Sequence, residues 1–184
     1  MKLHIKNMVC PRCIMAVQDI LRSAGISVSS VSLGEAEIED ELTEKQRRKL
    51  SDALSNIGFE LLDDPRSQTV EQLRLCIIEW VRMKGNHPKM SDYICSRLHQ
   101  DYSALSKLFR ESLGETIERY AITHRVEYAK ELLFDNQLTT SEIAYMLGYS
   151  SPAHFSTQFK QTTGMTPKMM REQKNNKRIP LTDL

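Results

Sequence analysis

The stretch from Thr139 to Pro167, TTSEIAYMLGYSSPAHFSTQFKQTTGMTP, limits the fold more tightly than any other part of the chain. Thr139 is followed three residues later by Glu142, which is the capping-box spacing that begins a helix. Gly148 ends this helix, because only glycine takes a positive φ without strain, and Ser151 caps a second helix. Two short helices joined by a glycine-containing turn form a helix-turn-helix, whose second helix enters the major groove of DNA. The same spacing also fits an ordinary helical hairpin in a bundle.

A match of residues favours the DNA-binding reading. The run Glu142–Pro167 resembles the second helix-turn-helix of AraC-type (AraC/XylS) transcription regulators almost end to end. Arg125–Leu133, RVEYAKELL, resembles the helix that connects the two motifs of that family. The resemblance implies an all-α domain over residues 70–172 that binds DNA through two helix-turn-helix motifs.

Helical periodicity accounts for the rest of this domain. A helix is expected from residue 70 to about 81, followed by a break at residues 85–88. Residues 90–98 and 102–113 predict a first helix-turn-helix with Asp101 as cap, and a long helix covers about 115–134. Twenty residues span about 30 Å, and one turn of DNA is roughly 34 Å, so this helix can place two recognition helices in successive major grooves.

Exposed positions of the two recognition helices are the candidates for contacting double-stranded DNA. They are Ser103, Ser106, Lys107 and Arg110 in the first helix and Ala153, His154, Ser156, Thr157 and Lys160 in the second. Hydroxyl groups can bond a base or a phosphate, and Lys107 can reach guanine. Arg110 and Lys160 lie near the ends of their helices and are expected to touch phosphate. His154 is equally well explained as a solvated surface residue.

Charge is unevenly distributed along the chain. Residues 1–65 hold 8 Lys and Arg against 11 Asp and Glu, whereas residues 66–184 hold 17 against 13. The basic excess therefore coincides with the predicted DNA-binding domain, as neutralisation of phosphates requires. No apolar run approaches the roughly 20 residues of a membrane helix, and the N-terminus lacks the pattern of a signal peptide, so we expect a cytoplasmic protein without membrane contact.

The first 64 residues predict a small α+β domain. Strands are expected at residues 3–7, 26–31, 36–38 and 59–62, with helices at 11–24 and 43–56. This βαββαβ order is that of a ferredoxin-like unit. A polar linker is expected at 65–69, and a mobile tail without apolar periodicity at 173–184.

Met8-x-Cys10-x-x-Cys13 lies between the first strand and the first helix. With the strand order, it resembles the heavy-metal-associated domain of copper chaperones and metal-pumping ATPases. The resemblance covers residues 1–64 and departs from the family pattern at Asn7, which replaces glycine, and at Val9, which replaces threonine. It implies that Cys10 and Cys13 are metal ligands and that Met8 packs behind the loop.

The position of Cys10 and Cys13 at a helix N-terminus favours the thiolate form, which binds metal. Two thiolates suit Cu(I) or Ag(I) best. Zinc is the alternative metal, although a closed zinc site needs four ligands and only Met8 and His4 are near in sequence. His4 is more simply a surface histidine. Dithiol redox chemistry and inert structural cysteines are the alternatives for this pair.

These features together predict a metal-responsive transcription regulator that is not an enzyme. In it, an N-terminal domain that senses a soft metal precedes the DNA-binding domain. It would control metal-handling genes through the transcription machinery, and a homodimer could form through the sensor domain or through Cys10 shared between chains. The alternatives are a thiol-redox-sensing regulator of AraC type and a metallochaperone, in which the C-terminal half would have no role.

Overall fold

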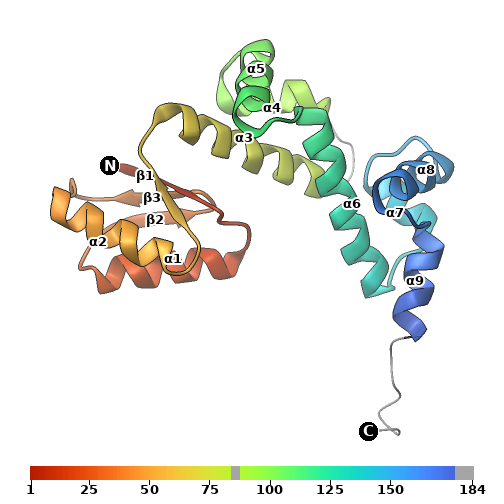
Figure 1. Cartoon of the computed structure of the whole chain (residues 1–184), viewed down its shortest axis with the longest axis horizontal. Helices are drawn as coiled ribbons and strands as arrows, with labels where there is room; N and C mark the ends of the chain where they lie inside the picture. Colours follow the sequence, from red (N-terminus) through yellow and green to blue (C-terminus); the bar gives the residue numbers. More distant parts are fainter. Residues whose placement is uncertain (84–87, 177–184) are drawn as a thin grey trace, which may run out of the picture. The chain divides into compact units, whose positions relative to one another are not determined.

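The computed structural model describes residues 1–83 and 88–176, with side chains to residue 173. The chain divides into two compact units, Met1–Leu75 and Cys76–Leu184, which we call unit 1 and unit 2 (Figure 1).

Unit 1 contains a four-stranded antiparallel sheet. Its elements are β1 (Lys2–Lys6), α1 (Pro11–Ser23), β2 (Val28–Ser32), β3 (Glu35–Ile38), α2 (Glu44–Ser55) and β4 (Glu60–Leu62). The strand order in the sheet is β2-β3-β1-β4, so β1 pairs with both β3 and β4. The predicted order of elements is therefore observed, with each boundary close to its expected place.

The alternation of residues in β1 explains how this sheet forms a core. Leu3 and Ile5 are buried, while Lys2, His4 and Lys6 face the other side. The buried face packs against α1 and α2, which lie on the same side of the sheet (Figure 1). The core that results joins Leu3, Ile5, Ala36 and Ile38 to Val17, Leu21, Leu50 and Leu54.

The segment expected to be a linker, residues 65–69, instead forms the first turns of α3 (Pro65–Arg82). The Asp64 carboxylate accepts hydrogen bonds from the backbone N–H groups of Ser67 and Arg66, each 2.9 Å long. Hydrogen bonds from Ser67, and then from Arg66, hold the pKa of the Asp64 carboxyl below its usual range. The proline occupies the first helical position, where an N–H has no intrahelical partner to lose. An aspartate and a proline thus begin a helix where the polar composition indicated a linker.

All the regular elements in the described part of unit 2 are helices. After the end of α3 come α4 (Met90–Leu98), α5 (Tyr102–Leu113), α6 (Ile117–Asp135), α7 (Thr140–Met146), α8 (Pro152–Thr163) and α9 (Pro167–Asn176). The bounds of α4 and α5 are the predicted ones, and α6 lies close to its predicted span. α9 was not predicted, and it includes residues 173–176 of the expected mobile tail; residues 84–87 and 177–184 lie outside the described part of the chain.

Four helices of unit 2 share one core. It contains Val126, Ala129 and Leu133 of α6, Ile143 and Ala144 of α7, Phe155 and Phe159 of α8, and Met170 of α9. In α8, Phe155 and Phe159 recur at helical spacing on the buried side, so the opposite side of that helix is exposed. No helix in the described residues is long and apolar enough to cross a membrane.

Candidate thiolate loop and DNA-binding surface

Cys10 and Cys13 are brought together at the N-terminus of α1. Their Sγ atoms are 3.4 Å apart, and the backbone N–H of Cys13 donates to the carbonyl of Cys10 at 2.9 Å. Cys10 is the N-cap residue, and both side chains are partly exposed. Hydrogen bonds from the backbone and then the side chain of Cys13 lower the pKa of the Cys10 thiol from its ordinary value. Both thiols are therefore accessible, and Cys10 is disposed towards the thiolate form.

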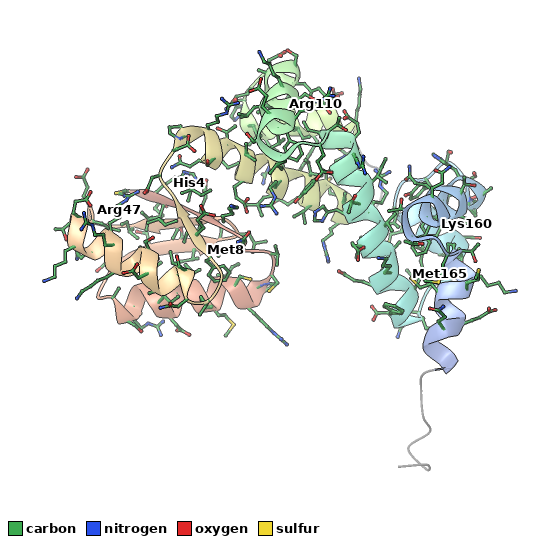
Figure 2. All side chains as sticks on the ribbon, in the orientation of Figure 1. His4, Met8, Arg47, Arg110, Lys160 and Met165 are labelled. Carbon is green, nitrogen blue, oxygen red and sulfur yellow. The ribbon has the colours of Figure 1, made fainter. Side chains whose placement is uncertain are left out.

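The surroundings of the pair limit which metal would fit. Within residues 1–83 and 88–176, no group of three or more His, Cys, Asp or Glu side chains is placed to hold a metal ion. Met8 is fully buried, as the resemblance implied, and lies in the core of unit 1 (Figure 2). Two sulfur donors alone suit a soft ion of low coordination such as Cu(I) or Ag(I), and they leave a tetrahedral zinc site two ligands short.

His4 is not the freely solvated surface residue that the sequence indicated. Its side chain is only 15% exposed, and Nδ1 lies 3.5 Å from the carboxylate of Glu35 on the neighbouring strand β3. Cross-strand pairing accounts for this position of the histidine, because directly opposed side chains on one sheet face lie close enough to interact. The side chain of His4 therefore interacts with a residue of its own sheet.

The loop that carries the cysteines is held at its start by contacts of Asn7 with Gly58 and Glu71. Asn7 has a φ of 73°, a left-handed conformation that asparagine tolerates better than most residues. Its Nδ2 donates to the carbonyl of Gly58 at 3.0 Å, and its backbone N–H donates to Oε1 of Glu71 at 3.2 Å. Glu71 is 5% exposed and also accepts from Arg74 at 2.8 Å. The asparagine was visible in sequence as a departure from the family pattern, but its partners were not.

The α7–α8 motif forms through the predicted local interactions. The backbone N–H of Thr139 donates to Glu142 at 2.7 Å, and the backbone N–H of Glu142 donates to Oγ1 of Thr139 at 3.2 Å. Gly148 has a φ of 76°, and Ser151 accepts from the backbone N–H of His154 at 3.2 Å. Both helix starts and the turn between them are therefore specified by neighbouring residues.

The exposed face of α8 presents the predicted DNA-contacting residues. Ala153, His154, Thr157 and Lys160 are exposed and Ser156 is partly exposed, whereas Phe155 and Phe159 are fully buried behind them. His154 is less independent than the others, because Nδ1 lies 3.4 Å from Oγ of Ser150 and its ring packs against Tyr149. The remaining four residues are available to a ligand.

The exposed face of α5 is arranged in the same way. Ser103, Lys107 and Arg110 are exposed and Ser106 is partly exposed, while Leu105 and Phe109 are buried. Asp101 caps the helix as predicted, accepting from the backbone N–H groups of Ser103 and Ala104. The hydroxyl of Ser103 also donates to Asp101, so Ser103 would meet DNA as an acceptor. Figure 2 shows Arg110 on α5 and Lys160 on α8, so each helix carries a cation in its last turn.

Comparison with known proteins identifies the C-terminal domain. A family model described as a helix-turn-helix domain matches residues 94–173. The HTH-type transcriptional activator RhaR of Cronobacter sakazakii is 36% identical over 81 residues, which cover 44% of this chain and 29% of RhaR. The chain spans less than a third of the length of the first curated relatives it matches.

Two solved structures are similar in fold. The C-terminal domain of AraT, a response regulator from Geobacillus stearothermophilus, has a TM-score of 0.52 and 26% identity over 60% of this chain and 88% of that domain. A transcriptional regulator with an AraC-type DNA-binding domain from Chromobacterium violaceum has a TM-score of 0.50 and 22% identity, over 58% of this chain and 96% of the other. Both helix-turn-helix motifs and the connecting helix α6 fall almost wholly within the region that the family model matches. Residues 94–173 therefore form a helix-turn-helix domain, whose fold is similar to that of an AraC-type DNA-binding domain.

Proposed function

We propose that this protein is a cytoplasmic, metal-responsive transcription regulator that acts without an enzymatic step. In this proposal α5 and α8 read double-stranded DNA in two successive major grooves, and Cys10 and Cys13 bind a soft metal ion. The observation that carries the DNA part is the repeated pattern of the two helices, each with buried aromatic or aliphatic residues behind an exposed row of hydroxyl and cationic side chains. Helix α6 supports the spacing, since its 19 residues span about 28 Å.

The DNA part can be tested without knowing the natural promoter. A duplex selected by the full chain from a randomised pool would be probed by hydroxyl-radical footprinting. Protection of two major grooves about one helical turn apart, on one face of the duplex, is expected. A footprint confined to one groove would contradict the use of both motifs, and binding without sequence preference would indicate DNA packaging instead.

We further propose that unit 1 is a ferredoxin-like sensor domain of the heavy-metal-associated type. The support is the βαββαβ order, the antiparallel sheet and the paired thiols at the start of α1. When bound, a Cu(I) or Ag(I) ion would replace the thiol protons and tie the two sulfurs together, so binding should weaken as pH falls. Elemental analysis after reduction should give one ion per chain, and Cys10→Ser or Cys13→Ser should abolish tight binding. X-ray absorption showing nitrogen and oxygen ligands would refute the assignment.

A thiol-redox sensor is a second candidate that one observation supports. The 3.4 Å separation of the two Sγ atoms is close enough for a disulfide to form with little movement. Mass spectrometry of the chain after mild oxidation, with Cys10→Ser as control, would detect a loss of two hydrogens at this pair. A metallochaperone is less well supported, because the DNA-binding domain has no part in that activity.

Regulation requires that metal and DNA influence each other. By linkage, metal can change DNA affinity only through its different affinity for the free and the DNA-bound protein, and the change is typically roughly 5- to 150-fold. DNA must then change the affinity for metal by the same factor. DNA titrations with apo-protein, Cu(I)-loaded protein and the Cys10→Ser, Cys13→Ser double variant test this. Three superimposable curves would show that metal binding does not change the affinity for DNA, and would contradict the proposed regulation. Sedimentation of the same samples would show whether a homodimer forms, and in vitro transcription would show contact with the transcription machinery.

A further inference from the structure

Arg125 is a partly buried cation in the middle of the connecting helix α6. Its guanidinium carbon lies 4.9 Å from the ring centroid of Trp80 in α3 and 5.3 Å from that of Tyr149 in the turn before α8. Both distances are within the range of cation–π attraction. In the described part of the chain, Nε of Arg125 is buried and has no hydrogen-bond partner. The guanidinium group of Arg125 is therefore in contact with two aromatic rings, one from α3 and one from the turn before α8.

Trp80 and Tyr149 are both firmly placed. Trp80 is 8% exposed, and Nε1 donates to the carbonyl of Pro88 at 2.9 Å. Tyr149 is 5% exposed, and burial raises the pKa of its hydroxyl, although the positive charge of Arg125 opposes this rise. The phenol hence keeps its proton for donation at neutral pH.

Tyr149 contacts three residues of α8. Its hydroxyl donates to Oε1 of Gln158 at 2.6 Å. Its ring lies 5.4 Å from that of His154, edge to face, and 5.2 Å from that of Phe155. These three contacts reach the first two turns of α8, next to the exposed residues Ala153 and Thr157. The orientation of Tyr149 is thus coupled to the orientation of the exposed face of α8.

We propose that Arg125 is a positioning residue of the second helix-turn-helix, which acts through Tyr149 to set how α8 presents its exposed face to DNA. The proposal rests on the proposed function, in which α8 reads bases. The two rings that its guanidinium contacts, Trp80 and Tyr149, lie outside that face. Its planar guanidinium can lie flat against two rings, whereas a lysine ammonium retains the charge but is compact and strongly hydrated. Arg125→Lys therefore removes the stacking and leaves the net charge unchanged.

The test uses full-length protein and a duplex selected by the wild-type chain from a randomised pool. Thr157→Ala and Ser106→Ala first assign the half-sites read by α8 and α5, as the half in which each variant loses preference. Arg125→Lys should then lower discrimination in the α8 half-site by roughly tenfold, the scale of one base contact, and leave the α5 half-site unchanged. Equal loss in both half-sites, or no loss, would overturn the proposal.

Arg82→Lys is the matched control. Arg82 also stacks on an aromatic ring of α6, at 4.7 Å from the centroid of Tyr128, and it is further bonded to Glu131 at 2.8 Å and 3.0 Å. It makes the same chemical change without reaching Tyr149, so both half-sites should be read as in the wild type. A selective loss in the α8 half-site with this control would refute the specific role of Arg125.

A second variant keeps the proposal open to refutation if Arg125→Lys unfolds. Tyr149→Phe retains the ring and removes the hydroxyl that donates to Gln158, so discrimination in the α8 half-site should fall by roughly fivefold. Unchanged discrimination with Tyr149→Phe would overturn the transmission through this residue. If Thr157→Ala and Ser106→Ala themselves left every preference intact, the proposed function would fail at that earlier step, which separates the two outcomes.

Discussion

Removal of the Lys160 charge should reduce the salt dependence of DNA binding by a predictable amount. Lys160 is exposed in the last turn of α8, and within the described residues its side chain has no ion-pair partner. If it neutralises one phosphate, Lys160→Ala lowers the slope of log K against log salt by about 0.9. Between about 50 and about 200 mM salt, the loss of affinity should then be roughly 3.5-fold smaller than for the wild type.

Fluorescence anisotropy on one labelled duplex, at four or more salt concentrations, measures this slope. Lys130→Ala is the control, since it removes the same charge from α6, where Lys130 is 2.6 Å from Glu127. Lys160→Ala should weaken matched and mismatched duplexes alike, because phosphate contacts carry no sequence information. An unchanged slope for Lys160→Ala, or an equal decrease for Lys130→Ala, would refute the phosphate contact.

Three further outcomes are expected. Cys10 should be alkylated by iodoacetamide faster than Cys76 at pH 7, since the pKa of Cys10 is lowered whereas burial raises that of Cys76, and peptide mass spectrometry would reveal any contrary order. Glu71→Ala should destabilise unit 1 by about 1–3 kcal/mol by leaving the Asn7 N–H without its acceptor, whereas Glu71→Gln should cost less, as circular dichroism in urea would show; equal losses would argue against that bond. Phe155→Ala should destabilise unit 2 by about 3–5 kcal/mol, measured by the fluorescence of the single tryptophan, and a loss below 1 kcal/mol would contradict its full burial.

The elements that could be predicted from the sequence are those specified by neighbouring residues. The capping box of Thr139 and Glu142 and the cap at Asp101 act within one helical turn, so the sequence contains both partners of each bond. α9 escaped prediction because Pro167 and Met170, the buried residues in its described part, are too few to give a clear apolar periodicity. The start of α3 escaped because a polar composition outweighed the Asp-Pro signal.

In the candidate site, too, contacts between neighbouring residues could be predicted from the sequence, whereas contacts between distant elements could not. Cys10 and Cys13 belong to one helical turn, so their spacing alone predicts that their sulfurs meet. The contacts of Arg125 with Trp80 and Tyr149 join three elements, and a single sequence contains no periodicity that would indicate them. The exposed rows of α5 and α8 lie between these cases, because the buried residues of each helix imply the exposed ones.

The loop around the cysteines bears on the choice between the metal sensor that we propose and a metallochaperone. The heavy-metal-associated pattern has glycine where this chain has Asn7, and the left-handed φ of 73° is the conformation that glycine would adopt most easily. Asparagine keeps this conformation and adds a side-chain bond to the carbonyl of Gly58, which glycine cannot make. The backbone bond to Glu71 reaches across 64 positions of sequence and anchors the loop a second time. A carrier that hands its ion to a partner benefits from a mobile loop, whereas a sensor must hold the ion long enough to alter DNA binding. The anchored loop therefore favours the regulator over the metallochaperone.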